Sequence, residues 1–255
     1  MGTAFWRVAL ALLPLIVLSR LQPARGNGTP RSPGDYAMVM LPGVFLAADL
    51  IAWHIALHHT TVANATLLSN LAPVFVTLFN WLFLSQRISR RFLLGLSVTT
   101  TGTVSLVGGL SALDSGNLAG DAIALLAGII YAGYILTVSW VRQRFSTSSL
   151  MIWSTASAAL STLPFALAFE ASLLPLTMAG WLILVGLAWV SQVGGQGCIA
   201  FALATLPTSF SSLTLLIQPI VAAVLAWMLL GEALTGYQLA GGAMILTGIL
   251  IARRG

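Results

Sequence analysis

The chain has 255 residues, of which 58% are hydrophobic and only 7% are charged. A soluble domain carries about a quarter charged residues, so this composition excludes a soluble globular protein and favours one embedded in lipid. The net charge of +5 would suggest nucleic acid as the partner of a soluble protein. Here the basic residues lie between apolar runs and report membrane orientation instead, so we expect the partners to be the lipid bilayer and a small molecule, with no nucleic acid.

Nine apolar runs are long enough, or nearly so, to cross a bilayer, which takes about 20 helical residues. The first run is treated as a membrane helix and not as a signal peptide, because no small-residue cleavage site follows it before Arg20. In chain order the predicted spans are Phe5 to Ser19, Tyr36 to Leu57, Thr61 to Leu84, Phe92 to Leu113, Leu118 to Val141, Ser148 to Phe169, Met178 to Leu203, Ser209 to Leu230 and Tyr237 to Ala252.

The arginines predict the orientation of these spans. All eleven basic residues are arginine, and ten of them fall at four sites that are separated by even numbers of spans. The sites hold Arg20, Arg25 and Arg31; Arg87, Arg90 and Arg91; Arg142 and Arg144; and Arg253 and Arg254. Because loops rich in arginine stay in the cytoplasm, we expect a multi-pass protein of the plasma membrane, or bacterial inner membrane, with a cytoplasmic C-terminus.

The sequence repeats itself at an offset of 146 residues without a gap. Between Thr60 and Gly102 this offset gives eight identities in 43 positions, among them Pro73 with Pro219 and Trp81 with Trp227. Every predicted span gains a partner except Leu118 to Val141, whose partner would precede Met1. The two copies are therefore predicted to be residues 1–113, with helices 2 to 5 of a unit, and residues 118–255, with helices 1 to 5.

A unit of five helices is odd, so the second copy must enter the membrane in the opposite sense to the first. We therefore expect an all-α integral membrane protein with nine transmembrane helices, an inverted five-plus-five repeat that lacks its first helix. Inverted repeats are typical of secondary transporters, which bind substrate near the midplane of the bilayer. Two explanations of the missing helix stay open: a truncated or mis-started ten-helix protein, and a genuine nine-helix variant.

Both copies resemble the EamA-type repeats of the drug/metabolite transporter superfamily. The resemblance rests on a helix with an internal proline, an aromatic end, a Gly-Glu turn and a glycine-punctuated helix. The second copy shows this pattern as Pro219, Trp227, Gly231-Glu232, Gly241 and Gly248. The first copy departs from it at Ser85-Gln86, where the family usually has Gly-Glu. The resemblance implies a transporter of small metabolites or drugs and says little about the substrate.

Asp49 is the acidic residue deepest inside a predicted span, and such residues normally mark function. At the offset of 146 its equivalent is Gly195, which is flanked by Gln192 and Gln196. Trp53, four residues after Asp49, shares its helix face. We therefore predict a substrate site with Asp49, Trp53, Gln192 and Gln196, in which Asp49 is also the candidate for proton coupling. The alternative is that Asp49 pairs structurally with Arg7 or hydrogen-bonds to a neighbouring helix.

A polar stripe with helical spacing follows in the span Thr61 to Leu84. It contains Thr66, Asn70, Pro73, Thr77 and Asn80. Thr66, Asn70 and Thr77 are predicted to bind substrate together with Gln218, which precedes the equivalent Pro219. The competing interpretation is interhelical hydrogen bonding, which is common for such residues in membranes. Pro73, Pro219 and Gly195 are the predicted helix breaks or hinges.

The function predicted from these features is secondary transport by alternating access, with export of a small metabolite or amino-acid-like compound favoured. The features do not name the substrate. The sequence contains neither a nucleotide-binding loop nor the motifs of hydrolases, so an intramembrane enzyme is not favoured and no cofactor or metal is expected. A membrane sensor, or a non-transporting fragment that keeps the carrier fold, is the alternative. A homodimer is compatible with the sequence and not specified by it.

Overall fold

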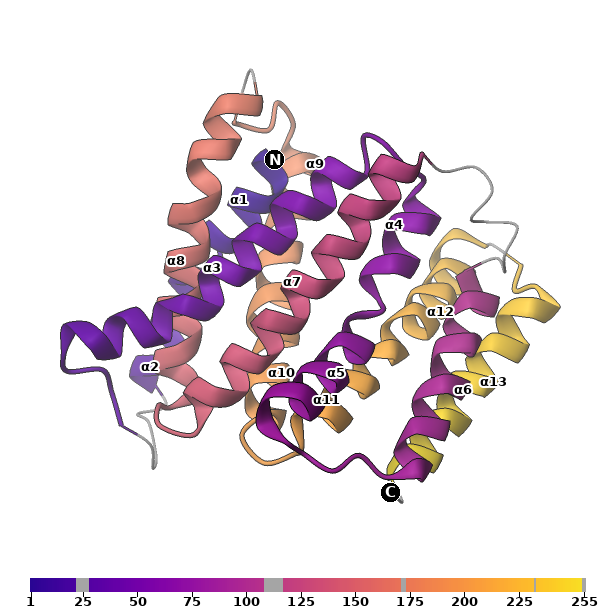
Figure 1. Cartoon of the computed structure of the whole chain (residues 1–255). Coiled ribbons are helices and arrows are strands. Elements are labelled where there is room, and N and C mark those ends of the chain that lie inside the picture. Colours follow the sequence, from indigo (N-terminus) through magenta and orange to yellow (C-terminus); the bar gives the residue numbers. More distant parts are fainter. Residues whose placement is uncertain (22–27, 108–116, 171–172, 232, 254–255) are drawn as a thin grey trace. The chain divides into compact units, whose positions relative to one another are not determined.

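The computed structural model describes residues 1–21, 28–107, 117–170, 173–231 and 233–253. Regular structure in these residues is helical, without a strand, as the composition predicted. Glu232 of the Gly-Glu turn lies outside the described residues, as do Arg25, Asp114 and Arg254. The described chain forms two compact units, each of which draws helices from both sequence copies (Figure 1).

The first unit comprises residues 1–54 and 133–206. It contains α1 (Gly2–Ala9), α2 (Leu12–Leu21), most of α3 (Pro33–Ala56), the end of α7 (Leu118–Arg142), α8 (Thr147–Phe169), α9 (Met178–Gly186), the π-helix η2 (Leu187–Gln196) and α10 (Gly197–Ala202). Helix α1 packs on α8, η2 and α9. A side chain at Gly43 of α3 would overlap the backbone of Ser154 in α8, so the absence of a side chain lets these two helices touch.

The second unit comprises residues 55–132 and 207–255. It contains α4 (Val62–Ser69), α5 (Ala72–Leu84), α6 (Arg90–Val107), the first part of α7, α11 (Thr208–Thr214), the short 3₁₀ turn η3 (Leu215–Ile217), α12 (Gln218–Leu230) and α13 (Gly236–Arg253). Helices α6 and α13 lie side by side, in magenta and yellow in Figure 1.

Four glycines form the crossing of α6 and α13. A Cβ added at Gly95 would lie 2.5 Å from the carbonyl oxygen of Gly248, and one added at Gly102 would lie 2.7 Å from that of Gly241. Because position 95 meets 248 while position 102 meets 241, the two helices run antiparallel. These four glycines therefore allow the two helices to approach closely.

Seven helical stretches of the described chain are long and apolar enough to cross a membrane. They are Gly2–Leu21, Pro33–Ala56, Val62–Leu84, Leu118–Arg142, Thr147–Phe169, Met178–Ala202 and Thr208–Leu229. The other two spans predicted from sequence, Phe92 to Leu113 and Tyr237 to Ala252, correspond to α6 and α13, which are helices of 18 residues each. Residues 108–113 of the first of these spans lie outside the described residues. Both fall outside these seven, and α6 is polar for a span because it begins with Arg90 and Arg91 and carries several threonines.

Two of the spans are interrupted just before a proline. A turn at Asn70 and Leu71 interrupts the α-helical hydrogen-bond pattern, and Pro73 then lies in the first turn of α5. In the second copy α11 gives way to the 3₁₀ turn η3, and Pro219 lies in the first turn of α12. Proline has no backbone N–H to donate and its ring crowds the preceding turn, which explains both interruptions.

The two copies also end these helices alike. Ser85 caps α5 in the left-handed conformation with a φ of 51°, and Gly231 caps α12 with a φ of 69°. Glycine adopts this conformation without strain, whereas serine does so at a cost. Ser85 therefore takes the backbone role of the glycine that the first copy lacks.

Candidate functional site

The residues predicted to bind substrate divide between the two units. Asp49 and Trp53 on α3 belong to the first unit, together with Gln192 and Gln196 on η2. These four residues come from both sequence copies, so folding places parts of both copies in one compact unit. The other four, Thr66, Asn70, Thr77 and Gln218, belong to the second unit.

The two glutamines are buried and make different contacts. Gln196 is 6% exposed, and its Oε1 accepts a hydrogen bond of 3.0 Å from the Tyr134 hydroxyl on α7. Gln192 is 1% exposed, and its Nε2 donates to the Thr155 hydroxyl on α8 over 3.5 Å. The Oε1 of Gln192 is buried without a hydrogen-bond partner in the structure. A buried acceptor without a donor costs free energy, so this atom is suited to accept a hydrogen bond from an N–H group of a ligand or from water.

The segment that carries the two glutamines is a π-helix of ten residues. π-Helical segments are rare and frequently occur at functional sites. The glycines within and beside it are not required for packing, since a Cβ added at Gly197 would meet nothing within 4 Å and those at Gly194 and Gly195 would make only ordinary contacts. Backbone flexibility therefore fits the environment of these glycines, and a role in close helix contact does not.

Asp49 interacts electrostatically with Arg7 on α1. The Asp49 side chain is partly buried, as is that of Arg7. Helix α1 also packs against η2 and α8, so Asp49 and Arg7 belong to the same unit as the two glutamines. The geometry is compatible with both interpretations of Asp49, a substrate site and a structural pair with Arg7.

The polar residues of the second unit are mostly engaged with their own helices. The Thr77 hydroxyl donates to the carbonyl oxygen of Pro73 over 2.7 Å. Asn70 ends α4, and its backbone N–H donates to carbonyl oxygens of that helix. Gln218 is exposed at the start of α12, next to the buried Pro219. Thr77 therefore fits the structural interpretation better than the substrate-binding one.

Several polar contacts were not predicted from the sequence. The carboxylate of Asp121, in the first turn of α7, accepts hydrogen bonds from the Thr60 hydroxyl at 2.5 Å and from the Asn64 side chain at 3.1 Å. Tyr134 and Thr155, which hold the two glutamines, were also missed. The spacing of Thr60, Thr61 and Asn64 before an apolar run is a helix-start signal, whereas nothing in the sequence marks Tyr134 or Thr155.

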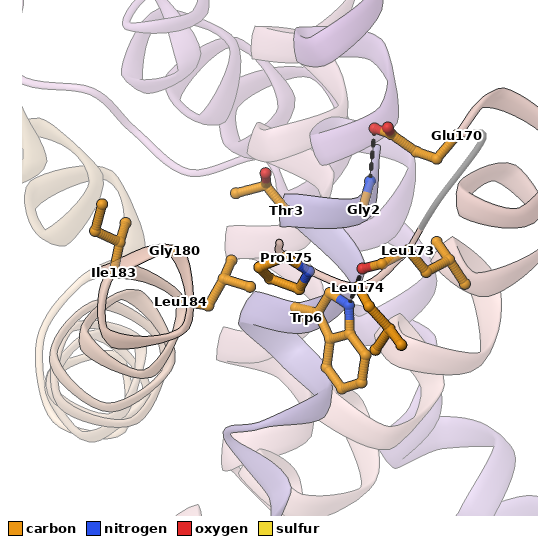
Figure 2. A pocket seen from close by; sticks show the side chains of 10 residues that line it. All are labelled: Gly2, Thr3, Trp6, Glu170, Leu173, Leu174, Pro175, Gly180, Ile183 and Leu184. Carbon is orange, nitrogen blue, oxygen red and sulfur yellow. Dashed lines mark hydrogen bonds between the residues drawn. The ribbon is translucent and has the colours of Figure 1, made fainter. Parts of the chain in front are cut away.

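A pocket of about 290 Å³ opens at the start of α1 in the first unit (Figure 2). At its rim Glu170 accepts hydrogen bonds from the N-terminal ammonium group and from the Gly2 N–H, which hold the pKa of this carboxyl below its usual range. The Trp6 indole N–H donates to the carbonyl oxygen of Leu173 over 2.6 Å. None of the residues predicted to bind substrate lines this pocket. Among the described residues, no group of three or more His, Cys, Asp or Glu side chains is placed to hold a metal ion.

Comparison of the sequence with known protein families gives a match to one family along most of the chain. The profile of the "EamA-like transporter family" matches residues 1–108 and again residues 118–254. A solved structure described as "Crystal structure of protein" superposes with a TM-score of 0.81 at 21% identity, covering 99% of this chain and 88% of that one. At this identity the superposition shows a shared fold only.

Three curated proteins are similar along most of the sequence. The pseudopaline exporter CntI of Pseudomonas aeruginosa is 26% identical over 98% of this chain and 84% of its own length. A probable amino-acid metabolite efflux pump of Salmonella typhimurium is 29% identical over 66% of this chain and 59% of its own length. A probable terminal-alkyne amino-acid exporter of Streptantibioticus cattleyicolor is 24% identical over 86% and 74%, respectively.

Proposed function

Because the chain belongs to the EamA-like transporter family, we propose that it exports a small amino-acid-like metabolite across the plasma membrane. The printed names of three relatives, each an exporter or efflux pump of such compounds, favour this direction and this substrate class. The chain has no nucleotide-binding loop, so a gradient or coupled flux supplies the energy. We propose that the protein is a transporter and not an enzyme.

The substrate site of this proposal is the polar interior of the first unit. The observation that carries it is the buried Gln192 Oε1, an acceptor without a partner on a π-helical segment. The Asp49–Arg7 pair supplies one charge of each sign in the same unit. A zwitterionic compound has an ammonium group for the acceptor and a carboxylate for the cation, so this set of side chains matches an amino-acid-like ligand. Trp53 and Gln196 complete the proposed site in the first unit. Within the second unit, Thr66, Asn70 and Gln218 stay candidates for substrate contact, whereas the Thr77 hydroxyl is engaged by its own helix.

The proposed architecture is the inverted repeat of nine spans with a cytoplasmic C-terminus, in which α6 and α13 also cross the membrane. The α6–α13 crossing supports it. Under the offset of 146 residues, Gly95 is equivalent to Gly241 and Gly102 to Gly248. Gly95 contacts Gly248, which is the equivalent of Gly102, and Gly102 contacts Gly241, which is the equivalent of Gly95. Two antiparallel equivalent helices make such reciprocal contacts when a two-fold axis in the membrane plane relates the copies.

Purified protein in proteoliposomes tests the proposed activity. The probe is a mixture of radiolabelled amino acids inside the vesicles, and efflux is measured with and without a pH gradient. We expect efflux above that of empty vesicles, and we expect the pH gradient to stimulate it if Asp49 couples protons. Efflux equal to that of empty vesicles, together with measurable amino-acid binding, would favour the sensor.

The variant Asp49→Asn separates the two interpretations of Asp49. If Asp49 contacts substrate or protons, this variant loses most of the efflux or its response to the pH gradient. Glu170→Gln is the matched control, because it makes the same acid-to-amide change outside the spans, and we expect its efflux to stay at the wild-type level. Unchanged efflux and unchanged pH response in Asp49→Asn would leave Asp49 with a structural role only.

A further inference from the structure

Helices α5 and α11 of the second unit meet through a polar contact at the buried side chain of Asn80. The Asn80 Nδ2 donates a hydrogen bond of 2.8 Å to the Ser209 hydroxyl. Asn80 is 1% exposed, and Ser211, two residues beyond Ser209, is 5% exposed. The contact joins the last turns of α5 to the first turn of α11, where Asn80 and Ser211 are buried and Ser209 is half-buried.

This contact is closed but incompletely hydrogen-bonded. The Oδ1 of Asn80 and the hydroxyl of Ser211 are both buried without a partner in the structure. Neighbouring hydroxyls are satisfied, since Ser212 donates to the carbonyl oxygen of Ser209 and Thr214 to that of Ser211. Leaving two buried polar atoms unpaired costs free energy that water would recover if the helices separated. The closed contact is therefore weaker than a fully satisfied one.

Helices α5 and α11 are each separated from the rest of their span by a helix interruption. The break at Asn70 and Leu71 precedes α5, and the 3₁₀ turn η3 separates α11 from α12. A helix of 7 residues that ends in such a turn can tilt without moving the helix that follows it. The interruptions thus let α5 and α11 separate without unfolding either span.

The contact lies toward the arginine-bearing side of the chain. Asn80 is in the last two turns of α5, shortly before Arg87, and Ser209 is at the beginning of α11. The residues equivalent to Asn80, Ser209 and Ser211 at the offset of 146 are Ala226, Ala63 and Ala65. All three equivalent residues are alanines, so the second occurrence of this pair of positions cannot form a side-chain hydrogen bond.

We propose that Asn80, Ser209 and Ser211 form a latch that closes the arginine-bearing end of the second unit and opens during transport. This inference rests on the proposed transport function. In the open state α11 has moved away from α5, and water hydrates the Asn80 Oδ1 and the Ser211 hydroxyl. In the closed state the Asn80–Ser209 hydrogen bond holds the two helices together.

Cross-linking tests whether the latch must open. The only native cysteine, Cys198, is first removed by Cys198→Ala. The pair Asn80→Cys and Ser209→Cys is then bridged with a short bis-methanethiosulfonate in proteoliposomes loaded with the radiolabelled amino-acid mixture. We expect bridging to lower efflux at least about tenfold and a reductant to restore it. Full efflux from the bridged protein would overturn the latch.

The control is a second pair within the same unit that should not need to separate. The Ser105 hydroxyl donates to the carbonyl oxygen of Tyr237 over 3.2 Å, where α6 and α13 pack closely. Bridging Ser105→Cys to Tyr237→Cys in the same background should leave efflux unchanged. Equal loss of efflux from both bridged pairs would show a general effect of cross-linking and would count against the latch.

A second measurement does not depend on transport. In the Cys198→Ala background, Ser211→Cys is labelled with a membrane-impermeant maleimide added from the arginine-bearing side. Adding Asn80→Ala removes the hydrogen bond of the latch, and we expect it to speed labelling about two- to tenfold, the change in equilibrium expected for one hydrogen bond. Thr214→Ala, which removes a hydrogen bond within α11 only, is the control. An unchanged labelling rate with Asn80→Ala would overturn the latch even if efflux is absent, whereas absent efflux with faster labelling would count against the transport function alone.

Discussion

Replacing Gly95 by alanine tests the α6–α13 crossing directly. The added Cβ would lie 2.5 Å from the carbonyl oxygen of Gly248 and 2.7 Å from the Cβ of Ala252. Alanine gains about 0.5–1 kcal/mol over glycine in a helix interior, but an overpacked contact costs about 1–3 kcal/mol. Because backbone atoms cannot move aside as a side chain can, we expect Gly95→Ala to destabilise the protein by about 1–2 kcal/mol.

Thermal unfolding of the detergent-purified protein measures this change through intrinsic tryptophan fluorescence. At about 2–4 °C per kcal/mol for a chain of this size, Gly95→Ala should lower the midpoint by several degrees. The matched control is Gly186→Ala, since a Cβ at this helical position would meet nothing within 4 Å, and we expect its midpoint to be equal or higher. A midpoint for Gly95→Ala at or above that of Gly186→Ala would refute the close crossing.

Four further substitutions have expected effects on the same unfolding midpoint. Ser85→Gly removes the strain of a left-handed serine and should stabilise the protein by about 1 kcal/mol; a lower midpoint would contradict this conformation. Asp35→Ala should cost about 1–2 kcal/mol, because the carboxylate accepts the backbone N–H groups of Arg31 and Ser32 just before α3. Arg144→Ala should cost less than about 1 kcal/mol, because this partner of Asp35 is 62% exposed, and an equal loss from both substitutions would show that the ion pair dominates. Tyr134→Phe should cost about 1–3 kcal/mol by leaving the buried Gln196 Oε1 without a donor, and an unchanged midpoint would show that this hydrogen bond contributes little.

Composition and repetition were sufficient to predict the membrane class and the family, because both depend on features spread along the whole chain. The interruptions at Pro73 and Pro219 could also be predicted, since proline acts on its own helix. The π-helix could not be predicted, because the spacing of Gln192 and Gln196 is equally typical of an α-helix. Identification of Tyr134 as the partner of Gln196 requires the packing of α7 on η2, which no local pattern encodes.

The grouping of helices was another feature that the repeat did not reveal. The offset assigns neighbouring spans to one copy or the other, whereas the compact units combine spans from both. Sequence similarity records which segments are equivalent, and packing decides which segments touch. For this reason Asp49 and Gln192, predicted from different copies, were found in the same compact unit.

The reciprocal glycine contact between α6 and α13 has the form of a self-complementary interface. In a symmetric homodimer a surface meets its own copy, so that residue i contacts residue j while j contacts i. Gly95 and Gly102 meet their counterparts in this way within a single chain. The contacts at the two ends of the crossing, Gly95–Gly248 and Gly102–Gly241, are therefore equivalent to each other. Each half of the sequence carries the surface that the other half needs, which is the property required for two separate half-length chains to pair in a membrane.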